Sequence, residues 1–108
     1  MTWVRACALG EVDPGDGFRW TPPEREPIAI FLVEGQVHAI DDTCSHGQAS
    51  LADEGYLDGR IVECGLHQGT FDVCTGKAMT WPCTLDLRTY PTRLDGDDVL
   101  VDLTPKEN

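Results

Sequence analysis

Short apolar runs, separated by clusters of glycine, proline and aspartate, dominate the pattern of this chain. The runs recur about every eight to twelve residues, and no stretch of useful length has the 3.6-residue periodicity of an amphipathic helix. They predict strands at residues 2–8, 18–20, 27–33, 37–40, 60–63, 69–73, 85–94 and 99–103. The pattern therefore predicts an all-β fold.

Two of these runs form the clearest local signal. Residues 27–33 and 37–40 flank the sequence Glu34, Gly35, Gln36. A short loop with a glycine between two β-branched runs is typical of a hairpin. We expect these two strands to pair with each other.

The middle of the chain, from about residue 41 to 82, has a different character. It is rich in glycine and proline, and only residues 60–63 and 69–73 are predicted to be strands. A loop-rich segment of this length is too long to be a passive connection in a small domain. We expect it to carry the function or to be ordered by a metal.

Length and charge narrow the class of protein. The chain has 108 residues, enough for one domain, and a formal net charge of −11. Such acidity opposes binding to nucleic acid or to an anionic membrane. The longest apolar run, Ile28–Val33, is far shorter than the ~18 residues of a membrane span. The first residues lack the pattern of a secretion signal, so we expect a cytoplasmic protein.

The cysteines point to metal or redox chemistry. They stand at positions 7, 44, 64, 74 and 83. An odd number without a secretion signal does not favour a full set of structural disulfides. Four of the five lie in the glycine-rich middle or at its edge.

Two of the cysteines are each followed closely by a histidine. The pairs are Cys44 with His46 and Cys64 with His67, and 17 residues separate His46 from Cys64. Nearby glycines allow backbone amides to approach a bound group closely. The pairs can therefore close around one metal centre. Buried cysteines with incidental histidines are one alternative, and a structural zinc site is another, although zinc fingers usually place both cysteines before both histidines.

At these boxes the chain resembles a known family, the Rieske-type [2Fe-2S] proteins. Among them it is most similar to the ferredoxins of bacterial aromatic-ring-hydroxylating dioxygenase systems of the biphenyl, cumene or phenylpropionate type. The motifs that carry the resemblance are Cys44-Ser-His46-Gly47, Cys64-Gly-Leu-His67, Gly69-Thr-Phe71-Asp72, Thr75-Gly76-Lys77-Ala78 and Thr89-Tyr90-Pro91. Together they extend over nearly the whole chain.

The resemblance implies a ligand set and a domain plan. Cys44 and Cys64 would bind one iron through their thiolates, and His46 and His67 would bind the other iron. The residues expected around the cluster are Gly47, Gln48, Gly69, Trp81 and Pro82. The implied fold is a single Rieske domain over 1–108, with stacked antiparallel sheets and a small loop-rich cluster-binding subdomain at about 41–83. Residues 1–40 and 84–108 would form its base.

The resemblance also implies the function. A ferredoxin of this type is a one-electron carrier between a flavin-containing ferredoxin reductase and a terminal oxygenase, and is not itself an enzyme. A Rieske-like small subunit held permanently in a reductase or oxidase complex is the alternative. Histidine ligation places the reduction potential between about −150 and +300 mV. We expect a potential at the low end of this range, because negative charge near the cluster disfavours the added electron. Many acidic residues and one basic residue, Arg60, lie near the two boxes in the sequence. The acidic residues are Asp41, Asp42, Asp53, Glu54, Asp58, Glu63 and Asp72.

The remaining candidates have weaker signals. Phe71 is expected to pack beneath the cluster loops as core. Cys7, Cys74 and Cys83 are expected to be inert buried thiols. His38 lies in a predicted strand with no cysteine at ligand spacing, so we interpret it as structural.

Overall fold

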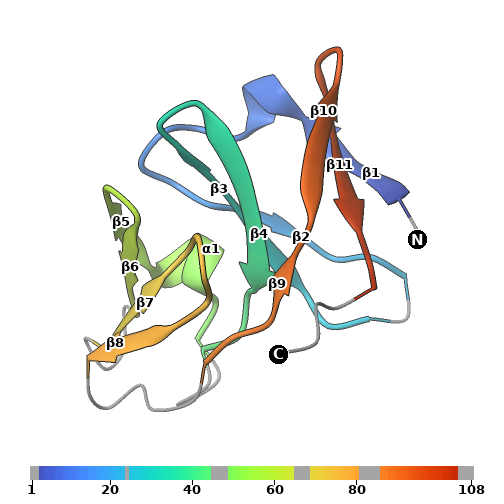
Figure 1. The fold of residues 1–108 in the computed structure, drawn as a ribbon. Coiled ribbons are helices and arrows are strands. Elements are labelled where there is room, and N and C mark those ends of the chain that lie inside the picture. The colour runs from blue at the N-terminus through green and yellow to red at the C-terminus, as the bar shows by residue number, and fades with distance from the viewer. Residues whose placement is uncertain (1–2, 24, 45–48, 65–68, 81–85, 105–108) are drawn as a thin grey trace.

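Strands make up most of the fold (Figure 1), as predicted. The computed structural model describes residues 3–23, 25–44, 49–64, 69–80 and 86–104. The strands are β1 (Trp3–Ala8), β2 (Phe18–Trp20), β3 (Ile28–Val33), β4 (Gln36–Asp41), β5 (Tyr56–Asp58), β6 (Ile61–Glu63), β7 (Thr70–Asp72), β8 (Ala78–Thr80), β9 (Thr89–Tyr90), β10 (Thr92–Asp95) and β11 (Asp98–Asp102). A 3-10 turn, Leu9–Glu11, and the short helix α1, Leu51–Glu54, complete the described elements.

The strands form three antiparallel sheets. Their strand orders are β1-β11-β10, β2-β3-β4-β9 and β5-β6-β7-β8. The first two sheets combine strands from both ends of the chain, whereas the third uses only the middle of the chain. Figure 1 shows the third sheet beside the base formed by the other two, with α1 near the junction.

Strand β3 lies in the central layer and faces two cores. Ile28 and Ile30 belong to an apolar cluster shared with the β1-β11-β10 sheet. Ala29 and Phe31 belong to a second cluster, shared with the third sheet. Because successive strand residues point to opposite faces, a strand between two cores must be apolar at every position. This explains why the residues of β3 are apolar without interruption, instead of alternating between apolar and polar.

The predicted hairpin is confirmed. β3 and β4 pair in antiparallel register, from Ile28 opposite Asp41 to Val33 opposite Gln36. The turn places Glu34 at φ 51° and Gly35 at φ 80°. Two consecutive positive φ values are the geometry of the type I′ turn that two-residue hairpins favour.

The prediction of one long strand over 85–94 is wrong. Among the described residues of this stretch, β9 and β10 are two separate strands in different sheets, and Pro91 lies between them. Proline has no N–H to donate to a sheet, so it marks the point where the chain leaves one sheet for the other. The two described residues before β9 are not part of a strand and instead bind the turn after β7. The Asp86 carboxylate accepts a hydrogen bond from the Ala78 N–H at 2.8 Å. The Leu87 N–H donates to the Gly76 carbonyl at 2.7 Å.

The described residues in the middle of the chain contain more regular structure than the composition predicts. They include β5, β8 and α1, none of which was predicted. Helix α1 starts because the Ser50 side chain accepts a hydrogen bond from the Asp53 N–H at 3.1 Å, a standard N-terminal cap. No helix in the described part of the chain is long and apolar enough to cross a membrane.

Candidate functional site

Cys44 and Cys64 each begin a loop, and the two loops are closed in the same way. The Cys44 N–H donates to the Ala49 carbonyl at 2.9 Å, and the Cys64 N–H donates to the Gly69 carbonyl at 2.8 Å. In both loops the donor and the acceptor are five residues apart. Residues just outside these bonds also pair, Thr43 with Ser50 and Glu63 with Thr70. The described residues at the two ends of each box therefore pair in the same way, and the two boxes span the same number of residues.

Both cysteines lie in one apolar core. Cys44 is 2% exposed and Cys64 is 0% exposed, and they belong to the same cluster of buried residues. Phe71, also fully buried, is part of this cluster, which confirms the prediction that it is a core residue. Two thiols that share a dry core can bind soft metals as thiolates, which is the donor chemistry that an iron–sulfur centre requires.

Asp42 fastens the first loop to the base. It is only 1% exposed. One carboxylate oxygen accepts from the Ala52 N–H at 2.8 Å, and the other accepts from Arg19 Nε at 3.2 Å. Its backbone carbonyl accepts from the Leu51 N–H at 2.8 Å. The start of α1 is therefore tied back to the residue that precedes the loop, so both loop ends are fixed.

The Asp72 carboxylate, which follows the second loop, also links two parts of the chain by hydrogen bonds. Its Oδ2 accepts from Arg60 Nε at 2.9 Å, and its Oδ1 accepts from the Cys74 N–H at 2.8 Å. Burial alone would raise the pKa of this carboxyl and is the largest single influence on it. The bonds from Arg60 and from the backbone together outweigh burial and hold the pKa below its usual value.

The lowered pKa of Asp72 predicts a specific loss of stability in acid. Its ionised form is favoured by folding, so it stabilises the fold above pH about 4, and this contribution disappears as the pH falls through the lowered pKa. We expect Asp72→Asn to cost about 1.5–3 kcal/mol at pH 7, and to cost less at pH 3. Urea unfolding of both proteins at several pH values tests this. The exposed Asp58→Asn is the control, and a cost that does not change with pH would contradict the prediction.

Gly76 connects the third sheet to the segment before β9. Its φ is +76°, and an added Cβ would lie 2.2 Å from the Leu87 carbonyl oxygen. The Gly76 N–H donates to the Asp72 carbonyl at 2.7 Å. A side chain at position 76 would therefore strain the backbone at its positive φ and would also clash with the Leu87 carbonyl.

We expect Gly76→Ala to destabilise the fold by about 2–4 kcal/mol, from left-handed strain plus overpacking. Gly59→Ala is a matched control, because its φ is +62° but nothing lies within 4 Å of the added Cβ. It should cost only about 1 kcal/mol. Denaturant unfolding measures both variants, and equal losses would exclude a role for the Leu87 contact.

The structure describes only part of the predicted site. Cys44, Cys64 and Gly69 are placed as above. The other predicted site residues lie outside the described residues, namely His46, Gly47, Gln48, His67, Trp81 and Pro82. Their roles stay predictions.

The predictions for the other cysteines have mixed outcomes. Cys7 is buried at 2% exposure, as expected, whereas Cys74 is only partly buried. Cys83 lies outside the described residues. His38 is in β4, but it is not isolated from cysteine, because its Nε2 lies 3.5 Å from Cys74 Sγ. The two residues are 36 positions apart, so no spacing motif could have indicated this contact.

The acidic surroundings are partly neutralised. Of the acidic residues predicted near the site, Asp42 pairs with Arg19 and Asp72 pairs with Arg60. Arg19 also lies 4.0 Å from Asp53. The sequence interpretation counted only Arg60 on the positive side and missed Arg19, which reaches the site from β2.

Known proteins are similar to this chain over almost its whole length. A family model described as the Rieske [2Fe-2S] domain matches residues 2–91. The ferredoxin component of a naphthalene 1,2-dioxygenase system from Pseudomonas aeruginosa is 45% identical over 94% of this chain and 96% of the relative. A biphenyl dioxygenase ferredoxin subunit from Pseudomonas sp. (strain KKS102) is 45% identical over 96% of this chain and 94% of the relative.

A solved structure is similar in its fold and its sequence. It is a chain in the complex of reduced oxygenase and oxidized ferredoxin in carbazole 1,9a-dioxygenase. The TM-score is 0.91 at 37% identity, and the match covers 98% of this chain and 97% of that chain.

Proposed function

The chain belongs to the Rieske [2Fe-2S] domain family, and we propose that it carries single electrons to the terminal oxygenase of an aromatic dioxygenase system. The family resemblance predicted from the Cys/His boxes is thus confirmed. Relatives of nearly equal length are named as ferredoxin components of such systems, which supports a carrier role and not an oxygenase role. We propose a flavin-containing ferredoxin reductase as the electron donor. The proposal gains its main structural support from the two boxes, which begin at buried cysteines and close in the same way at their described ends.

We propose that Cys44 and Cys64 bind one iron of the cluster and that His46 and His67 bind the other. The shared core of the two cysteines supports the first half of this ligand set. The sequence spacing supports the second half, because a histidine stands two or three residues after the cysteine in each box, and the described ends of both boxes close in the same way. The bound cluster supplies the one-electron redox chemistry. The chain's own contribution is to fix the loops and to keep water from the thiolates.

The supporting shell follows from the same arrangement. We propose that Gly47, Gln48, Gly69, Trp81 and Pro82 surround the cluster, and that about 41–83 forms the cluster-binding part on a base from 1–40 and 84–108. The sheet β5-β6-β7-β8 lies wholly within that middle segment, which supports the division. A cytoplasmic location is supported by Cys7 and Cys74, which are free thiols, since reducing compartments keep thiols free.

Spectra of the purified protein test the proposal directly. The dithionite-reduced protein should give the electron paramagnetic resonance signal of a mixed His/Cys cluster, with its low average g-value. The protein should then pass electrons from a flavin-containing reductase to an aromatic-ring oxygenase in a reconstituted assay. A colourless protein that holds zinc, or a signal typical of four cysteine ligands, would overturn the proposal.

A further inference from the structure

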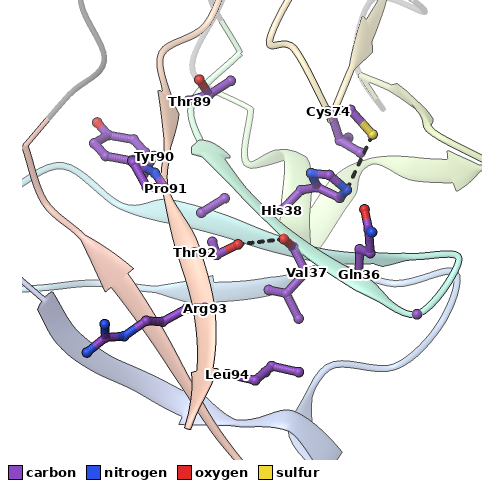
Figure 2. Close-up of a pocket in the computed structure, with 13 residues that line it drawn as sticks. Gln36, Val37, His38, Cys74, Thr89, Tyr90, Pro91, Thr92, Arg93 and Leu94 are labelled. Atoms are coloured by element: carbon purple, nitrogen blue, oxygen red, sulfur yellow. Dashed lines mark hydrogen bonds between the residues drawn. The ribbon is translucent and has the colours of Figure 1, made fainter.

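A thiol and an imidazole meet outside the two cluster loops. Cys74 follows β7 in the third sheet, and His38 lies in β4 of the central sheet. Their Sγ and Nε2 atoms are 3.5 Å apart (Figure 2), and Cys74 forms no disulfide. The contact therefore bridges two layers of the fold with two side chains that are common metal ligands.

The pair has open space on both sides. A cavity of about 430 Å³ lies between β4 and the β9–β10 segment, where Pro91 diverts the chain. A second cavity of about 480 Å³ lies toward Glu34 and Arg60. Gln36, His38 and Cys74 line both cavities. Gln36 extends to the same side of β4 as His38 (Figure 2), as residues two apart on a strand do. An ion held by the pair would have room for water ligands.

The distance between the two atoms fits a tetrahedral ion. Zinc binds thiolate sulfur at about 2.3 Å and imidazole nitrogen at about 2.0–2.1 Å. With a tetrahedral angle between them, the sulfur and nitrogen would be about 3.6 Å apart. The observed separation is 3.5 Å. The separation of the two donor atoms is therefore the one that a shared tetrahedral ion requires.

The charges around the pair include both signs. Burial, the largest influence, raises the pKa of the Cys74 thiol; Arg60 lowers it, and the Asp72 and Glu34 carboxylates raise it. Two carboxylates against one guanidinium leave a net negative charge near the pair, which favours a bound cation. Burial, the largest influence, lowers the pKa of His38, while Asp72 raises it and Arg60 lowers it. His38 therefore stays neutral at neutral pH, and the neutral imidazole is the form that binds metals.

We propose that Cys74 and His38 form an open binding site for a thiophilic divalent cation such as Zn²⁺. Binding replaces the thiol proton, which passes to solvent, and no electrons are transferred. Within the described residues, no group of three or more His, Cys, Asp or Glu side chains is placed to hold an ion. Water and the Gln36 amide oxygen complete the coordination, so the affinity is modest. The ion cross-links the central sheet to the third sheet.

Zinc binding to the cluster-loaded protein tests this site. Equilibrium dialysis should find one Zn²⁺ per chain, and zinc-edge X-ray absorption should find one sulfur neighbour at about 2.3 Å. Cys74→Ser and His38→Gln should each weaken binding at least tenfold. Cys7→Ser is the matched control, because Cys7 is a free, buried thiol in the other core, and it should bind zinc like the unaltered protein. Iron content and the visible spectrum should not change on zinc addition.

A second measurement needs no variant. Zinc should slow alkylation of Cys74 by iodoacetamide at least tenfold, as followed by peptide mass spectrometry, without slowing alkylation of Cys7. Absence of this protection, or zinc without a sulfur neighbour, would overturn the proposal. So would zinc that displaces iron, because it would then occupy the cluster ligands. These outcomes are separate from failure of the electron-carrier proposal, which the spectrum of the zinc-free protein tests.

Discussion

Cys64→Ser is expected to abolish the cluster, with bound iron and the visible absorption falling to less than about a tenth of their normal values. Serine keeps the size of the side chain but replaces a soft thiolate by a hydroxyl that stays protonated near neutral pH. Cys64 is fully buried in the core that it shares with Cys44, so the substitution removes one of the two buried thiols of that cluster. Iron analysis and absorption spectra of the freshly purified variant measure the effect.

The Cys7→Ser variant separates ligation from burial. Cys7 is also buried, at 2% exposure, but it lies in the core on the other side of the central sheet. It should retain a full complement of cluster and lose only stability, because the hydroxyl is buried without the packing of sulfur. A normal spectrum in Cys64→Ser would remove Cys64 from the ligand set. Equal cluster loss in both variants would make burial, not ligation, the cause.

Local signals in the sequence were sufficient for several elements. The β3–β4 hairpin was predictable because Glu34 and Gly35 supply a turn between two β-branched runs. Strands β1, β2 and β11 were predicted within one or two residues of their observed ends. In each case the information lies within a few consecutive residues.

Elements that depend on distant contacts were missed. Helix α1 has only four residues and is held by the Asp42 carboxylate, which reaches it from before the loop. Among the described strands, β8 pairs with β7 alone, and its first residue is held by Asp86. The long strand predicted over 85–94 is wrong because the prediction ran through Pro91, where the chain changes sheets.

The candidate site also has features that the local sequence shows and features that depend on distant contacts. The two Cys/His boxes are visible as short spacings, and so is the glycine after each box. The residues that fix the loops are Asp42, Asp72 and Gly76. Asp72 and Gly76 lie in motifs of the family resemblance, but nothing in the local sequence of the three residues shows what they contact. Their roles arise from partners more than ten positions away in the cases of Arg19, Arg60 and Leu87. The Cys74–His38 contact depends on tertiary structure in the same manner.

Phe71→Ala is expected to cost about 3–5 kcal/mol of folding free energy, since it removes a fully buried aromatic ring from a close-packed core. Phe71 is 0% exposed and pairs with Val62 across β6 and β7. It lies two residues after Gly69, whose carbonyl closes the second loop. The cavity left by the ring would therefore open beside the cysteines as well as within the sheet.

A matched aromatic deletion tests whether position decides the effect. Tyr56→Ala removes a ring that is 71% exposed at the edge of the same sheet, and it should change stability by no more than about 0.5 kcal/mol. Urea unfolding gives both costs, and the rate of bleaching in a chelator gives cluster retention. Phe71→Ala should lose its cluster faster, yet the spectrum of the intact cluster should be unchanged, because the ring supports the loops without contributing a ligand. A cost below about 1 kcal/mol, or an altered spectrum before bleaching, would contradict this division between packing and ligation.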